Sequence, residues 1–235
     1  MQAKILATAL GALLLSGVSL ARADSTPQHS PPLNEFRAGL YYVTYHVDAT
    51  DITGPYVPPG VGIDVNDVTT AYFAYVRTLS THWALELALG YPPLTETVGK
   101  GPPTVGSVPY DGQVISTARW FAPTLLFHYV FGDETSRWRP YIGAGINYTK
   151  FYSRQSTEAG NAASGGPTQI SLPASVGPAV TAGIGYHPSE HWGFYASYSV
   201  SKVSSTLTAD TAGVIRTSHI DFWPHALVIS AGYSF

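Results

Sequence analysis

Large apolar residues alternate with small or polar ones at a period of two in several segments of this chain. Between Trp83 and Tyr91, for example, the odd positions are Trp, Leu, Leu, Leu and Tyr, and the even positions are Ala, Glu, Ala and Gly. This pattern is typical of a β-strand with unlike faces. The alternation predicts eight strands, of which the first two are the least regular: 36–47, 67–78, 83–91, 119–131, 140–152, 176–187, 191–203 and 226–235.

The connections between these strands alternate in length. Three are short: 79–82, 132–137 and 188–190. Four are long and rich in Pro, Gly, Ser and Thr: 48–66, 92–118, 153–170 and 204–224. Tight turns on one side and long loops on the other are typical of an up-and-down transmembrane barrel. The sequence therefore predicts an all-β fold, an eight-stranded antiparallel up-and-down transmembrane β-barrel over residues 36–235, whose last strand pairs with the first and leaves no open edge.

The first residues predict export instead of a folded element. Lys4 precedes an apolar run over 5–15, and Ala21-Arg22-Ala23 has the small-x-small form of a cleavage site. We interpret 1–23 as a secretory signal peptide, because the apolar run is too short to span a membrane as a helix. Residues 24–35 are then expected to form an N-terminal periplasmic segment.

The composition excludes several classes of function. Charged residues make up only 11% of the chain, well below the usual share of about a quarter. The net charge of −3 argues against a nucleic-acid partner. The chain has no cysteine, which excludes disulfides and thiolate metal sites, and we expect no cofactor. No segment after the signal peptide is apolar over the length of a spanning helix, so a membrane location requires strands.

Three segments resemble a known family. They are "PTLLFHYVFGDETSRWRPYIGAGINYTKFY" at 123–152, "WALELAL" at 83–89 and "AGYSF" at 231–235. They are similar to the OmpW family of small outer-membrane β-barrel proteins, which includes the AlkL type. The resemblance runs through the mature chain in order, and the first segment is long enough to be specific.

The resemblance implies passive uptake of small hydrophobic molecules from outside, with release sideways into the membrane through a gap in the barrel wall. It places the protein in the outer membrane of a Gram-negative bacterium. The partners expected are outer-membrane lipid and lipopolysaccharide, small hydrophobic ligands and the barrel-insertion machinery, and we expect a monomer. The alternative is a structural or adhesive barrel with a filled interior that acts through its extracellular loops.

Charged residues within the predicted strands are candidates for an interior network. Glu86 lies on the small-residue face of its strand, and Arg37 and Arg77 are expected to point inward. An Arg or Lys facing lipid at mid-depth costs roughly 2–4 kcal/mol, so an inward position is favoured. The network is either a polar plug or a proton-linked gate, or it is plain structural pairing.

Four large residues are predicted to face the barrel interior: Phe73, Tyr75, Trp120 and Leu126. They would line an apolar tunnel for hydrophobic ligands. Inward glycines such as Gly143 and Gly183 would leave room for such a tunnel. The alternative is ordinary filling, because the interior of an eight-stranded barrel is just wide enough for side chains.

Prolines mark a candidate lateral gate. Pro92 and Pro93 follow the third predicted strand, and Pro123 interrupts the fourth. Proline cannot donate to a strand ladder, so these two strands are expected to lose pairing here. The position would then be either an opening in the wall or a strand end with a bulge.

Two motifs suggest catalysis and are better explained otherwise. His187-Pro-Ser-Glu-His191 matches the H-x-x-E-H zinc-protease pattern, but a metal site of this kind needs a helix, and here strands flank a proline-containing turn. Ser218 and His219 are adjacent, so they would point to opposite faces of a strand. We therefore expect that the protein is not an enzyme.

Overall fold

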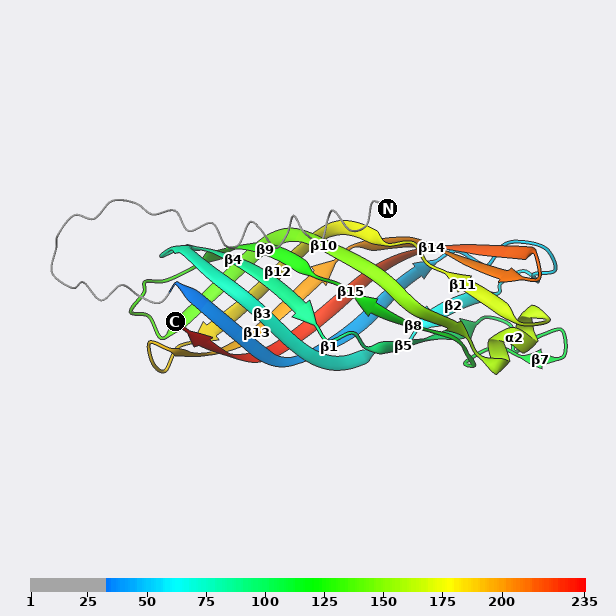
Figure 1. Ribbon diagram of the computed structural model, residues 1–235, viewed down its shortest axis with the longest axis horizontal. Helices are drawn as coiled ribbons and strands as arrows, with labels where there is room; N and C mark the ends of the chain where they lie inside the picture. The colour runs from blue at the N-terminus through cyan, green and yellow to red at the C-terminus, as the bar shows by residue number, and fades with distance from the viewer. Residues whose placement is uncertain (1–32) are drawn as a thin grey trace. The chain divides into compact units, whose positions relative to one another are not determined.

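Eight antiparallel strands form a closed ring in the computed structural model, which describes residues 33–235 (Figure 1). The predicted signal peptide, 1–23, lies outside the described residues, as do residues 24–32. Each strand of the ring pairs with the next, and the last pairs with the first. In ring order the strands are β1 (Asn34–Ala49), β3 (Val68–Ser80), β4 (Trp83–Gly90), β9 (Thr124–Val130), β10 (Trp138–Ser156), β12 (Ser175–Tyr186), β13 (Trp192–Ser201) and β15 (Val214–Ser234). The predicted eight-stranded barrel is confirmed.

The pairing of β1 with β15 closes the ring along the full length of β1, from Glu35 opposite Ser234 to Ala49 opposite Ile220. The sequence predicted that the barrel begins after residue 35, whereas its first strand begins at Asn34. Asn34 and Glu35 belong to β1, because the C-terminal strand continues far enough to pair with them. The C-terminal aromatic is anchored as well, since Phe235 N–H donates to the Asn34 carbonyl at 2.8 Å.

The long connections contain strands that extend the barrel beyond the ring, at the right of Figure 1. They are β2 (Gly62–Val65), β5 (Leu94–Lys100), β8 (Val114–Phe121), β11 (Thr168–Ser171) and β14 (Val203–Thr211), with the hairpin of β6 (Thr104–Val105) and β7 (Val108–Pro109) and a short helix, α2 (Glu158–Ser164). The predicted loops 92–118 and 204–224 are thus largely extended strands. Their Ser-, Thr- and Gly-rich sequences carry little hydrophobic alternation.

The turn between β14 and β15 shows why that hairpin forms. Ala212 and Gly213 both have positive φ, 51° and 89°, as the two central residues of a type I′ turn require. Such a turn matches the twist of the strands that it joins. Among the described residues, no helix is both long and apolar enough to cross a membrane.

The outer face of the ring is apolar and the inner face is mixed. Neighbouring side chains such as Leu40 and Ile229 project outward and are largely exposed, whereas Val43 and Val228 on the same strands are buried inside. Aromatic side chains gather toward the end of the short turns, where Trp83 stacks on Phe127 and Phe36 stacks on Phe235. A wide apolar face with an aromatic band is the surface expected of a barrel embedded in lipid.

Inward glycines of the ring are filled by the side chains of neighbouring strands. A Cβ added at Gly143 would lie 2.3 Å from the His128 ring, and one at Gly183 would lie 2.5 Å from the Tyr141 ring. At Gly232 it would lie 2.0 Å from Glu35 Oε1. The expectation that inward glycines leave room for a tunnel is therefore wrong at these positions: the space holds polar and aromatic side chains.

Replacing Gly232 by alanine tests this packing. The added methyl group must displace the Glu35 carboxylate from its hydrogen bonds, and we expect Gly232→Ala to lower the free energy of unfolding by about 2 kcal/mol. Urea unfolding of the protein in lipid vesicles measures this change. Gly62→Ala is the control, because its nearest neighbour would be 3.6 Å away. Equal stability of the two variants would contradict the prediction.

Candidate functional site in the barrel interior

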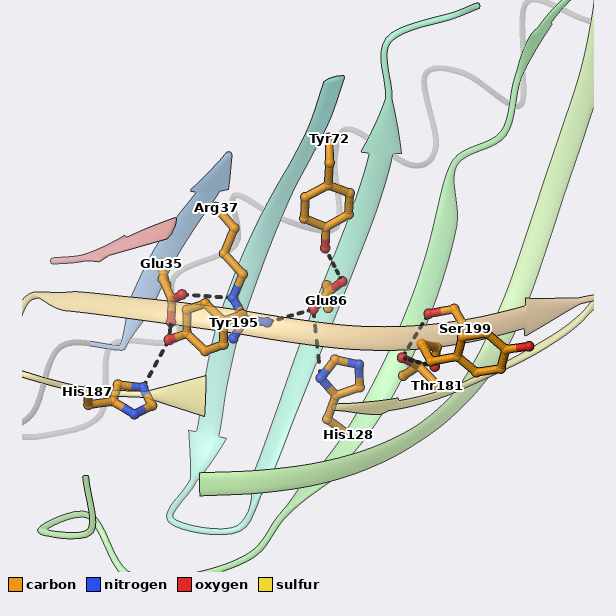
Figure 2. Close-up of polar contacts among 10 residues, drawn as sticks. Glu35, Arg37, Tyr72, Glu86, His128, Thr181, His187, Tyr195 and Ser199 are labelled. Carbon is orange, nitrogen blue, oxygen red and sulfur yellow. Dashed lines mark hydrogen bonds and ion pairs between the residues drawn. The ribbon is translucent and has the colours of Figure 1, made fainter. Parts of the chain in front are cut away.

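A cluster of charged and polar side chains crosses the barrel interior near the end of the short turns (Figure 2). We call it the polar floor; its members are Glu35, Arg37, Tyr72, Glu86, His128, His187 and Tyr195. They come from β1, β3, β4, β9 and β13 and from the turn after β12. Their side chains meet because the ring places inward positions of these strands at one level.

Arg37 is the centre of the polar floor. Its Nε donates to Glu35 Oε1 at 2.8 Å, and its Nη1 donates to Glu86 Oε2 at 3.1 Å. The guanidinium carbon also lies 3.6 Å from the centre of the Tyr195 ring, in cation–π contact. Both ion pairs are buried, since Glu86 is only 4% exposed and Arg37 8%. A buried charge requires such compensation from several partners.

Two tyrosines satisfy the remaining carboxylate oxygens. Tyr72 Oη donates to Glu86 Oε1 at 2.6 Å, and Tyr195 Oη donates to Glu35 Oε2 at 2.8 Å. His187 Nε2 lies 2.9 Å from the same Tyr195 oxygen. Because the tyrosine proton goes to Glu35, His187 must carry its proton on Nε2 and donate it to Tyr195. His187 belongs to the turn after β12, and burial lowers its pKa, which favours the neutral imidazole.

His128 closes the other side of the floor. Its ring stacks on Tyr141 with centroids 4.9 Å apart, and its Nδ1 lies 3.8 Å from Glu86 Oε2. Besides the two histidines and two tyrosines, the floor holds two carboxylates and one guanidinium. This packed, hydrogen-bonded layer obstructs the barrel between the cavities above it and the end of the short turns.

Small cavities lie above the floor, toward the long connections, in the described part of the interior. The lower cavity, of about 50 Å³, has Glu86, Tyr72 and Leu126 in its lining. The middle cavity, of about 60 Å³, is mainly apolar and contacts Val43, Trp120 and Phe222 among others. The mouth cavity, of about 70 Å³, lies within the extension and is lined by residues of the long connections. The lower and middle cavities share Tyr41, Ala122, Asn147, Ser201 and Pro224, so they are neighbours.

The barrel wall is interrupted beside the lower cavity. β4 and β9 pair as far as Ala88 opposite Thr124, and β5 and β8 pair from Leu94 opposite Arg119. Within the described chain, no ladder pair joins 89–93 to 120–123. Leu89, Gly90 and Ala122, from the two sides of this interruption, line the lower cavity.

Prolines account for the interruption. Pro92, Pro93 and Pro123 lack the N–H that a ladder requires, and they lie on the two facing edges. The flanking segments remain attached elsewhere: Tyr91 N–H donates to the Ala71 carbonyl, and Tyr148 N–H donates to the Pro123 carbonyl. A side-chain hydrogen bond from Arg119 Nη1 to the Pro92 carbonyl, 2.8 Å long, crosses the opening.

The four residues predicted to line a tunnel divide into two pairs. Trp120 is 7% exposed and contacts the middle cavity, and Leu126 contacts the lower cavity. The inward orientation of Phe73 and Tyr75 is wrong. Phe73 is 49% exposed on the outer face, and Tyr75 packs against the outward ring of Phe36. The register of β3, with Ala74 opposite Arg37, places its even-numbered residues inside.

The same register corrects Arg77. Its side chain lies at the outer rim, where Nη1 donates to Asn34 Oδ1, and it takes no part in the polar floor. Arg37 and Glu86 do meet in the interior. Sequence reasoning did not include five members of the polar floor in the interior network: Glu35, Tyr72, His128, His187 and Tyr195. The parity of Arg37 pointed to Glu35, two residues before it, whereas the neutral Tyr and His side chains gave no charge signal.

The two catalytic motifs take the positions expected without catalysis. His187 and His191 bound the turn between β12 and β13, and His187 bonds to Tyr195. In the described residues, no group of three or more His, Cys, Asp or Glu side chains is placed to hold a metal ion. Ser218 is buried, whereas the adjacent His219 is exposed, so the two side chains lie on opposite faces of β15.

Removing the central cation tests the polar floor. Arg37→Met leaves two buried carboxylates without a counter-charge, and we expect the free energy of unfolding to fall by about 3–5 kcal/mol. The loss can be followed by the temperature at which the folded barrel converts to the unfolded band in gel electrophoresis. Arg77→Met removes the same charge at the rim and should cost no more than about 1 kcal/mol. A larger loss for Arg77→Met would contradict this assignment.

Comparisons with known proteins agree with this geometry. The model of the OmpW family matches residues 35–235. Outer membrane protein W of Salmonella typhimurium is 29% identical over 174 residues, 74% of this chain and 76% of the relative. The fold is similar to the crystal structure of OprG from Pseudomonas aeruginosa, with a TM-score of 0.77, 22% identity and coverage of 88% of this chain and 97% of that chain. It is also similar to the solid-state NMR structure of AlkL in DMPC lipid bilayers, with a TM-score of 0.63, 16% identity and coverage of 92% and 97%.

These findings settle the class of the protein. The family's barrels are non-enzymatic and lie in the outer membrane of Gram-negative bacteria, and the same holds for this chain. The sequence resemblance is confirmed by a match that covers every strand of the ring except the first residue of β1. The chain belongs to the OmpW family of outer-membrane β-barrel proteins.

Proposed function

We propose that this barrel takes up small hydrophobic molecules passively from outside and releases them sideways into the membrane. The observation that carries the proposal is the position of the wall interruption. It lies next to the lower cavity, directly above the polar floor that obstructs the straight route through the barrel. A molecule that descends the interior therefore meets charged groups ahead and an unpaired wall beside it.

The interior above the floor suits apolar cargo. Val43, Trp120 and Phe222 line the middle cavity, and half of the residues that line the mouth cavity are Ile, Val or Ala. Going further along the axis would require an apolar molecule to break the buried ion pairs of Arg37. Lateral release avoids that cost, because the molecule moves into lipid, and the transfer of apolar surface into an apolar environment is favourable.

The size of the cavities favours slender molecules. Volumes of about 50 to 70 Å³ exceed the space that one water needs, but they are well below the 300 Å³ or more of usual ligand pockets. An unbranched chain can occupy successive small cavities while side chains such as Trp120 shift. A bulky rigid molecule would have to displace several of them together.

The expected partners follow from this role. The cargo is a small hydrophobic ligand, and outer-membrane lipid receives it beside Pro92, Pro93 and Pro123. Lipopolysaccharide surrounds the extension, the barrel-insertion machinery places the chain in the membrane, and we expect a monomer to suffice because the interruption lies within one chain.

Sealing the wall tests lateral release. Leu89→Cys combined with Pro123→Cys places two thiols one residue beyond the last ladder pair, in a chain without other cysteines. We expect oxidation of this pair to lower the uptake of radiolabelled decane by cells that carry the protein by about tenfold or more, and reduction to restore it. Uptake is counted relative to cells without the protein.

Two controls make the result specific. Leu85→Cys with Phe127→Cys places a second pair across the intact ladder, where oxidation should change nothing. A small sugar measures passage of polar solutes. If wild-type protein gives no uptake of decane above protein-free cells, the transport proposal fails, and a structural or adhesive barrel becomes the better assignment. Uptake that persists in the oxidised gate pair would reject lateral release.

A further inference from the structure

The mouth cavity is enclosed by all four long connections. Ile52 and Val57 reach it from the segment before β2, and Ile115 comes from β8. Ile170 comes from β11, and Leu207 from β14. The lining is otherwise apolar or neutral, with one exception: Arg216 of β15 is the single charged residue that contacts the cavity.

Arg216 has no counter-ion in the described part of the chain. Its Nε donates to the Pro55 carbonyl and its Nη1 to Thr211 Oγ1, both at 3.2 Å. Both partners are neutral, and none of the ion pairs among described residues includes Arg216. A guanidinium has five N–H groups, so three of those of Arg216 have no hydrogen-bond partner among residues 33–235.

Arg216, a cation without a counter-ion beside an apolar cavity, is suited to bind an anionic group. Arg216 is half-buried, and its remaining donors form the planar fork that matches a carboxylate. The net charge of the chain is −3, so a lone guanidinium beside an apolar cavity runs against the general charge. The contrast with Arg37 is direct, since that cation is held by two carboxylates.

Apolar side chains continue from the mouth cavity into the barrel. Ile63 and Leu207 line the mouth cavity, and they belong to the same buried cluster as Leu172, Val203 and Phe222, which line the middle cavity. A molecule held by its polar end at Arg216 therefore has a continuous apolar surface for its other end.

We propose that the mouth cavity is a binding site for amphiphilic monocarboxylates, such as medium-chain fatty acids, whose carboxylate pairs with Arg216 and whose alkyl chain lies in the apolar cavity. This proposal rests on the proposed uptake function and narrows its substrate class. The carboxylate provides recognition at the mouth, and the hydrocarbon chain provides the affinity for the interior.

The test compares an anionic and a neutral probe of equal chain length. Cells that carry the protein are given radiolabelled decanoate or decane at low concentration. Arg216→Gln removes the charge and keeps the length for hydrogen bonds to Pro55 and Thr211. We expect it to lower protein-dependent decanoate uptake by about tenfold, because hydrogen bonds to charged groups are among the strong ones, and to leave decane uptake unchanged.

Arg154→Gln is the matched control. Arg154 is exposed in the extension and donates only to the backbone carbonyls of Phe151 and Leu172, and it contacts none of the cavities described above. It removes the same charge, so a general attraction of anions to the mouth would lower decanoate uptake in both variants. An equal loss in Arg154→Gln would overturn the site.

A binding measurement separates this proposal from transport. Titration of octanoate into the full chain in lipid nanodiscs, followed by calorimetry, should give a dissociation constant that rises about tenfold in Arg216→Gln and not in Arg154→Gln. If neither decanoate nor decane is taken up, the uptake function fails while this titration still decides the site. Octanoate binding that is absent in wild type, or unchanged in Arg216→Gln, would overturn the proposal.

Discussion

Every backbone N–H within the hydrocarbon layer needs a partner from the protein, because lipid offers none. The ring meets this requirement through eight ladders, one of which is the closure of β1 on β15. Where the ladder between neighbouring strands is interrupted, prolines lie on the two facing edges. The wall opens at Pro92, Pro93 and Pro123, which have no N–H to satisfy, so the interruption leaves fewer unpaired donors than it would with other residues at these three positions. The candidate exit is therefore compatible with the requirement that closes the rest of the barrel, that each backbone N–H has a partner.

The interior obeys a second constraint, that a buried charge must be matched. Arg37 satisfies it with two carboxylates, and two tyrosines complete the carboxylates. The surrounding strands supply glycine where the large side chains need space, as Gly232 does for Glu35. The floor and the cavities above it are therefore complementary: small residues do not create an empty tube at the floor level, and the free volume lies farther toward the mouth.

Much of the fold could be predicted from the sequence, because a strand with one face in lipid and one inside has an unmistakable period of two. Strands such as β4 and β9 show it clearly, and their parity placed Glu86 and Leu126 inside the barrel. The same alternation, continued back into β8, placed Trp120 inside as well. The parity of β3 failed because both of its faces carry aromatic and small residues, so Tyr72 and Phe73 are indistinguishable by hydrophobicity alone. Only the pairing with β1 decides which face points inward. The strands of the extension escaped notice because their Ser-, Thr- and Gly-rich sequences carry little hydrophobic alternation. The Tyr and His members of the polar floor escaped because neutral side chains give no charge signal.

The hairpin of β14 and β15 has a consequence for where the protein operates. β14 contains nine residues, which at about 3.3 Å each correspond to roughly 30 Å of strand. A hydrogen-bonded wall of that length is a rigid collar, and in the proposed uptake function it would carry the mouth away from the bilayer surface into the sugar layer of lipopolysaccharide. For an oily molecule that layer is a poor solvent, and diffusion across it is the slow part of the journey inward. Under the proposed function the collar would shorten this journey, so the advantage that the protein confers should depend on the thickness of the sugar coat of the cell.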